Sequence, residues 1–234
     1  MAVTTSQYKL GTSSLGEALF EALRTRIING DIEPGEKVTE LRVAQEYGVA
    51  RPTAKSCLER LTSLGLLRRV AHKSAVVPRL TKAEIEDLYF SRSVFESTAV
   101  AFLAEKQLVT DEVVRAQEAM RLAEQHGEFT ELVQADIRFH WGLVHGFGSE
   151  RLSRMYEMIS GEIHLTMGQY RAHRRTSISN VTSEHQAVID AIASGDAATA
   201  RLELERHIRL AKERVIAQLH QDGSAPDQVD ADAG

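Results

Sequence analysis

Four side chains of metal-binding type lie on helical segments with compatible spacing. Asp136 and His140 are four residues apart, so on a helix they project side by side. His185 lies 10 residues before Gly195 and His207 lies 12 residues after it. If the flanking segments form an antiparallel helical hairpin about this glycine, each imidazole lies about 15–18 Å from the turn, because a helix rises 1.5 Å per residue.

Three imidazoles and one carboxylate suit a divalent metal ion and leave coordination positions open for water or for a ligand carboxylate. An isolated Asp-x-x-x-His pair is more often an ordinary pair on a helix surface. His185 and His207, however, are expected at the same height on the two helices of the hairpin, and this favours the metal interpretation. The predicted ligands are Asp136, His140, His185 and His207.

A second group of functional side chains lies nearer the N-terminus. Residues 51–63 have the period of a helix, and its first turn carries Arg51, Thr53 and Lys55. Arg51 and Lys55 share a face, from which they can reach guanine edges or phosphates in a major groove. A basic hairpin follows, suited to gripping a nucleic-acid backbone. Its basic residues are Arg68, Arg69, His72 and Lys73.

The elements around this basic group are short. Leu15, Leu19, Leu23 and Ile27 repeat every four residues and predict a helix over 15–28. Further helices are expected over 40–47, capped by Thr39, and over 51–63. Strands at 66–70 and 74–77 would flank the polar turn 71–73. Three helices and a hairpin within about 65 residues form a winged helix-turn-helix.

The rest of the chain is helical in period, and a domain boundary is expected at residues 78–82. Helices are predicted at 82–106, 110–126, 128–146, 150–172, 182–193 and 196–220. The fold class is therefore mainly α, with an N-terminal winged helix-turn-helix followed by an all-helical antiparallel bundle. The expected organisation is a mobile tail 1–14, a DNA-binding domain 15–79, a helical domain 80–220 and a disordered tail 221–234.

Charge is divided unevenly along the 234 residues, whose net charge is -5. Residues 1–80 hold 12 basic against 8 acidic side chains, whereas the rest holds 16 against 25. This asymmetry suggests different partners for the two parts. The one cysteine, Cys57, fits a reducing compartment, and no signal peptide or membrane span is apparent, so a cytoplasmic protein is expected.

The N-terminal part resembles GntR-type bacterial transcription regulators. The string NGDIEPGEKVTE at 29–40 is similar to their first-helix exit, and 43–44, 47–51, 58–61 and 65–67 extend the likeness over 15–79. The chain departs from the family pattern at Ala50, Lys55 and Ser74, where serine, arginine and glycine are usual. Ala50 lacks an N-cap oxygen, a loss of about 1 kcal/mol for the helix that follows.

Residues 82–220 resemble the FCD ligand-binding domain of the FadR-like branch. The similar strings are 136–140, 184–185, 207–208 and the Arg92-x-x-x-Glu96 pair, whereas Glu150 replaces a common asparagine. The resemblance implies a bound metal, with zinc ahead of nickel and manganese, and an effector that is a small organic or sugar acid. Arg92 is the candidate for holding the effector, ahead of Arg171, Arg174 and Arg175. The pairing is chemically compatible, because a divalent cation beside a guanidinium makes a carboxylate site.

The resulting hypothesis is a homodimeric transcription regulator, not an enzyme, that binds a pseudo-palindromic double-stranded DNA operator under effector control. Two alternatives use the same four metal ligands. One is a helical metalloenzyme, although the sequence places no further Glu or His as a general base. The other is a metal sensor with no organic effector.

Overall fold

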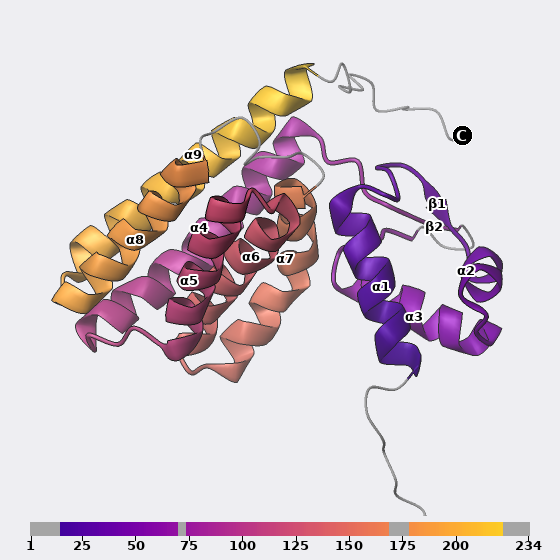
Figure 1. Ribbon diagram of the computed structural model, residues 1–234, viewed down its shortest axis with the longest axis horizontal. Helices are drawn as coiled ribbons and strands as arrows, with labels where there is room; N and C mark the ends of the chain where they lie inside the picture. The colour runs from indigo at the N-terminus through magenta and orange to yellow at the C-terminus, as the bar shows by residue number, and fades with distance from the viewer. Residues whose placement is uncertain (1–14, 70–73, 169–177, 222–234) are drawn as a thin grey trace, which may run out of the picture.

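The computed structural model describes residues 15–69, 74–168 and 178–221 (Figure 1). It has a small N-terminal domain and a larger helical bundle, as predicted. The expected tails, the tip of the hairpin and the three alternative arginines at 171–175 lie outside the described residues. Among the described helices, none is long and apolar enough to cross a membrane.

The N-terminal domain begins with α1 (Leu15–Asn29), followed by α2 (Glu40–Tyr47) and α3 (Arg51–Ser63). Thr39 caps α2, as expected, by accepting a hydrogen bond from the Arg42 backbone amide. Gly48 ends α2 in the left-handed conformation, which glycine adopts without steric cost. Ala50 occupies the N-cap of α3 and makes no side-chain bond, so the predicted lack of a cap at this helix is confirmed.

The predicted hairpin is only partly correct. The two-stranded sheet pairs β1 (Lys37–Val38) antiparallel with β2 (Ala75–Val76). The predicted strand 66–70 contributes a single bridge, from Arg68 to Val76. The reason is that the backbone amides of Leu66 and Leu67 both bond to the Leu61 carbonyl, where they close the end of α3. They are therefore unavailable to a sheet.

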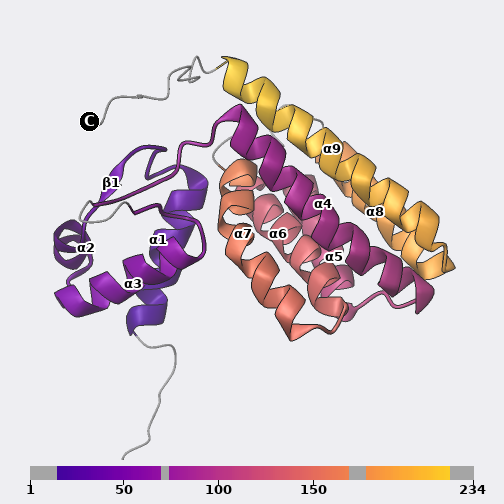
Figure 2. The same cartoon turned by 180° about the vertical axis from the view of Figure 1, so that it is seen from behind.

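Six helices are described in the bundle (Figures 1 and 2). They are α4 (Lys82–Glu105), α5 (Asp111–His126), α6 (Phe129–Gly146), α7 (Glu150–Gly168), α8 (Ile178–Ser194) and α9 (Ala197–Gln221). Helix α4 is central and packs against α6, α7, α8 and α9. A capping box at Thr81 and Glu84 starts α4 directly after the linker.

Helix α8 begins four residues earlier than predicted, at Ile178 instead of 182. The stretch 177–180 predicts a break, but α8 includes Ser179 and Asn180, because serine and asparagine are well tolerated near a helix N-terminus. The expected extension of α7 to residue 172 lies outside the described residues. Gly195 makes the α8–α9 turn with a φ of 82°, which supports the predicted hairpin.

Candidate metal centre and nucleic-acid interface

The four predicted metal ligands come together inside the bundle. Asp136 and His140 project from α6, His185 from α8 and His207 from α9, and all four are buried. One potential ligand atom from each residue can be chosen so that all lie within 4.8 Å of one another. Residues separated by up to 71 positions in sequence thus form one cluster.

The distances within the cluster suit a metal ion. His207 Nε2 lies 3.2 Å from both His140 Nε2 and His185 Nε2. Two nitrogens bound tetrahedrally at Zn–N distances of about 2.0–2.1 Å would be roughly 3.3 Å apart. The carboxylate completes the set, since Asp136 Oδ1 lies 3.5 Å from His185 Nε2 and Oδ2 lies 3.9 Å from His140 Nε2. A buried N₃O donor set of this kind fits zinc and related divalent ions.

Glu96 orients the first of the three imidazoles. Its Oε2 accepts a hydrogen bond from His140 Nδ1 at 2.6 Å, which leaves Nε2 facing the cluster. Its Oε1 accepts from Arg92 Nε at 2.8 Å and from the Tyr156 hydroxyl at 2.7 Å. Burial alone would raise the pKa of Glu96, but Arg92 and His140 hold it at about 2, so the group is a carboxylate.

Glu184 performs the same role for a second imidazole. It accepts a hydrogen bond from His207 Nδ1 at 2.8 Å and is held by Arg214 Nη2 at 2.5 Å. Burial would raise the pKa of Glu184, but the bonds from His207 and Arg214 lower it below its usual value. Burial lowers the pKa of His207 to about 4, so this imidazole is neutral and its Nε2 can bind a metal.

Arg92 is a buried cation whose charge is only partly compensated. Its side chain is 0% exposed, and its Nη1 and Nη2 have no hydrogen-bond partner among the described residues. Its Nε donates to the Glu96 carboxylate that also holds His140, and the guanidinium carbon lies 5.5 Å from the centroid of the Tyr89 ring. A buried guanidinium edge without a hydrogen-bond partner is energetically costly, and an anionic group could offset that cost. The role of Arg92 in holding an effector remains a prediction.

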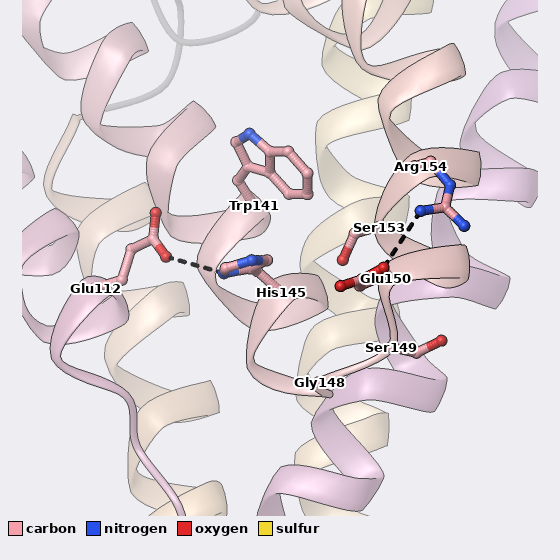
Figure 3. Close-up of a pocket in the computed structure, with 8 residues that line it drawn as sticks. All are labelled: Glu112, Trp141, His145, Gly148, Ser149, Glu150, Ser153 and Arg154. Carbon is pink, nitrogen blue, oxygen red and sulfur yellow. Dashed lines mark hydrogen bonds and ion pairs between the residues drawn. The ribbon is translucent and has the colours of Figure 1, made fainter.

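A second pocket opens on the bundle surface between α5, α6 and α7, with a volume of about 590 Å³ (Figure 3). Its charged groups already pair with each other, Glu112 with His145 at 3.8 Å and Glu150 with Arg154 at 3.5 Å. These four side chains are also exposed to solvent. The surface pocket therefore lacks the unsatisfied, desolvated charge that distinguishes the surroundings of Arg92.

Helix α3 presents the expected basic first turn on the N-terminal domain. Arg51 and Lys55 are exposed, Thr53 is half-buried, and Lys55 lies 3.8 Å from Glu59 one turn later. All three side chains are accessible on the helix predicted to enter the major groove. Thr53 and the two basic residues remain predictions as DNA contacts.

The basic residues predicted for the hairpin are not all placed alike. Arg69 pairs with Glu40 at 3.1 Å. Arg68 points toward the helical bundle, where it pairs with Glu84 and Glu162. His72 and Lys73 lie outside the described residues. Arg68 could therefore contact DNA only after leaving these carboxylates.

Sequence reasoning missed Glu184, Arg214 and Tyr156. A signal for Glu184 was available, because it lies 11 residues before Gly195 and so is level with His207 across the hairpin. Tyr156 had no comparable signal, since its contact with Glu96 depends on how α7 packs against α4.

Comparison with known proteins places both parts of the chain. The model for "Bacterial regulatory proteins, gntR family" matches residues 15–77, and the FCD domain model matches 87–210. The gluconate operon transcriptional repressor of Bacillus licheniformis is 27% identical, covering 80% of this chain and 79% of the repressor.

Two solved structures share the fold. A GntR transcriptional regulator from Rhodococcus sp. RHA1 has a TM-score of 0.75 at 22% identity, covering 88% of this chain and 99% of that one. The Zn²⁺-bound FCD domain of the transcriptional regulator TM0439 has a TM-score of 0.52 at 20% identity, covering 61% and 99%. The metalloenzyme alternative finds no support in these names. The chain belongs to the GntR family, carries an FCD domain, and is a DNA-binding transcription regulator rather than an enzyme.

Proposed function

We propose that operator binding by this protein is controlled by a small carboxylate, an organic or sugar acid, bound at a metal ion in the bundle. The observation that carries the proposal is the buried Arg92 guanidinium, whose Nη1 and Nη2 have no hydrogen-bond partner among the described residues, joined through Glu96 to His140. A carboxylate that binds the metal with one oxygen and Arg92 with the other would satisfy both. The B. licheniformis relative is named for gluconate, a sugar acid.

The proposed metal is a divalent ion held by Asp136, His140, His185 and His207, with zinc ahead of nickel and manganese. Three converging Nε2 atoms and one carboxylate support it. The similar FCD domain of TM0439 binds Zn²⁺. When bound, the ion supplies a Lewis-acidic position for an anionic ligand.

The proposed operator is a pseudo-palindrome bound by a homodimer acting in the cytoplasm, with Arg51, Thr53 and Lys55 as base-edge or phosphate contacts. Assembly is supported by exposed apolar side chains on the neighbouring helices α4 and α7, whose ribbons are seen in Figure 2. On α4, Phe90 is 67% exposed and Val94 follows one turn later; on α7, Met158 is 66% exposed and Met155 precedes it by three residues. Exposed apolar residues at such spacing are typical of an interface between protein chains.

Fluorescence anisotropy with the intergenic DNA beside the protein's own gene tests the proposal. Zinc-loaded and metal-stripped protein are titrated across a salt series with scrambled competitor DNA, then with a panel of carboxylic acids. We expect selective binding that one class of acid changes by about 5–150-fold, the usual range of allosteric coupling. Arg92→Lys, which keeps the charge but loses the fork, should weaken this response.

The outcomes separate the alternatives. If metal alone changes DNA affinity and no acid has an effect, the protein is a metal sensor and the carboxylate proposal is wrong. If saturating metal and acids both leave the affinity unchanged, control by this site is wrong as well.

A further inference from the structure

Helix α7 lies directly against the backbone of the DNA-binding domain. A Cβ atom at Gly161 would lie 1.8 Å from the Leu64 carbonyl oxygen, and one at Gly168 would lie 2.1 Å from the Ile28 carbonyl oxygen. No other residue fits at either position without moving a backbone. We call this contact of α7 with residues 28 and 64–66 the seam.

An ion-pair network fastens the seam. Arg68 pairs with Glu162 of α7 at 2.8 Å and with Glu84 of α4 at 2.5 Å, so it joins the DNA-binding domain to two bundle helices. Gly65 lies beside it, and a Cβ there would be 3.0 Å from Glu162 Cγ. While the seam is closed, Arg68 is occupied and is withheld from DNA.

The seam also contains empty space and a buried nitrogen without a hydrogen-bond partner. It borders a cavity of about 250 Å³ lined by residues of both domains. His164, which is 9% exposed, lines this cavity, and its Nδ1 has no hydrogen-bond partner among the described residues. An unpaired buried nitrogen is energetically costly, and opening the seam to water would relieve that cost.

The helix that forms the seam also contacts the metal centre. Tyr156 is five residues before Gly161 on α7, and its hydroxyl donates to the carboxylate that holds His140. Tyr156, Glu96 and His140 are all buried. A shift of the His140 imidazole therefore constrains where α7 can lie, and a shift of α7 constrains the imidazole. One rigid helix thus connects the two sites.

We propose that α7 is a docking surface for the protein's own DNA-binding domain, and that Tyr156 makes docking depend on occupancy of the metal centre. With an ion bound, His140 would be held in place, and through Glu96 and Tyr156 it would hold α7 against Leu64. Docking then retains Arg68 at Glu162. The inference rests on the proposed function only in taking the four-residue cluster to bind a metal.

Trypsin cleavage after Arg79, in the linker between the domains, measures docking in the full chain without any DNA. The products are identified by mass spectrometry, with and without zinc. We expect zinc to slow this cleavage by about fivefold or more in the unmodified protein. In Tyr156→Phe, the zinc effect should disappear while zinc stoichiometry is unchanged. Tyr89→Phe is the matched control, because it removes a different α4–α7 bond, to Thr166, and should keep the zinc effect.

Gly161→Ala tests the seam itself. It should speed cleavage after Arg79 even with zinc present, whereas Gly146→Ala, which meets only side-chain atoms, should not. Should Gly161→Ala fail to fold, Glu162→Gln opens the seam without a steric change and should also speed cleavage. The proposal is overturned if zinc does not slow cleavage in the unmodified protein, if Tyr156→Phe keeps the zinc effect, or if neither seam variant speeds cleavage.

Apart from metal binding by the four-residue cluster, these results are independent of the proposed function. Zinc-dependent cleavage without selective DNA binding would support the seam and count against the operator proposal. Effector-controlled DNA binding with zinc-independent cleavage would support the operator proposal and count against the seam.

Discussion

His140 Nδ1 lies 2.6 Å from Glu96 Oε2, and both residues are fully buried. This contact fixes which ring nitrogen faces the other metal ligands, because an Nδ1 that donates to a carboxylate leaves Nε2 with its lone pair free. The cluster of Asp136, His140, His185 and His207 is therefore preorganised by residues outside it, which would favour the proposed metal binding.

The same logic predicts the effect of Glu184→Gln. Glutamine keeps the shape but removes the charge that orients His207, so zinc affinity should fall by about 10–100-fold. Competition with a chromophoric chelator measures this. Glu213→Gln, on the exposed side of α9, is the control and should leave affinity unchanged. Equal affinities in all three proteins would show that Glu184 has no orienting role.

Removing a metal ligand should have a larger effect. His140→Ala is expected to abolish stoichiometric zinc binding, measured by atomic emission after gel filtration. The stabilisation by zinc should vanish too, a loss of about 2.7 kcal/mol when free zinc is 100 times its Kd. His126→Ala, an exposed histidine of α5, serves as control. Full zinc occupancy in His140→Ala would contradict the metal assignment.

The metal-free protein should begin to lose stability at a higher pH than it would if only its carboxylates titrated. Burial lowers the pKa of His164 to about 3, whereas an unfolded histidine titrates near 6.5. Between these values the unfolded state binds the extra proton, so stability falls as pH falls, at ~1.4 kcal/mol per pH unit for one histidine. His207, with a pKa of about 4, adds to the slope.

Urea denaturation at several pH values between about 4 and 7 measures that slope. His164→Asn cannot titrate and should reduce it by about one proton. His126→Asn, which is exposed, should leave it unchanged. An identical slope in His164→Asn would mean that His164 is not held neutral.

The missing cap of α3 offers a stabilising change. Ala50→Ser supplies an acceptor for the Thr53 backbone amide, because Pro52 in the same turn has no N–H, and should raise the free energy of unfolding by about 1 kcal/mol. Ala50→Val, which cannot cap, is the matched control at the same position. Thermal denaturation compares the two variants. Equal Tm values would show that the introduced hydroxyl accepts no hydrogen bond from the Thr53 amide.

The exposed first turn of α3 predicts the pattern of DNA affinity. Arg51→Ala should weaken operator binding by about 1–3 kcal/mol and relax base preference, if Arg51 reads a base edge. Lys55→Ala should instead weaken binding to all sequences and lower the salt slope by about one. Anisotropy titrations over a salt series distinguish these effects. Arg201→Ala, at an exposed position of α9, is the control.

The sequence was most informative where period and spacing carry the information. The equal height of His185 and His207 on either side of Gly195 could be predicted from the rise per residue of a helix alone. In the structure the two imidazoles meet across the hairpin. The strand predicted at 66–70 failed because propensity does not show that Leu66 and Leu67 amides close α3. Tyr156 and the seam depend on how separate helices pack, which no local pattern encodes.

Trp141, the single tryptophan of the chain, follows His140 directly and lines both the surface pocket and the cavity at the seam. Its indole ring lies 6.1 Å from the ring of Tyr156, between centroids. The protein therefore carries a built-in optical reporter at the point where its two domains meet. Its emission should follow ligand occupancy and domain separation in unlabelled protein, in real time.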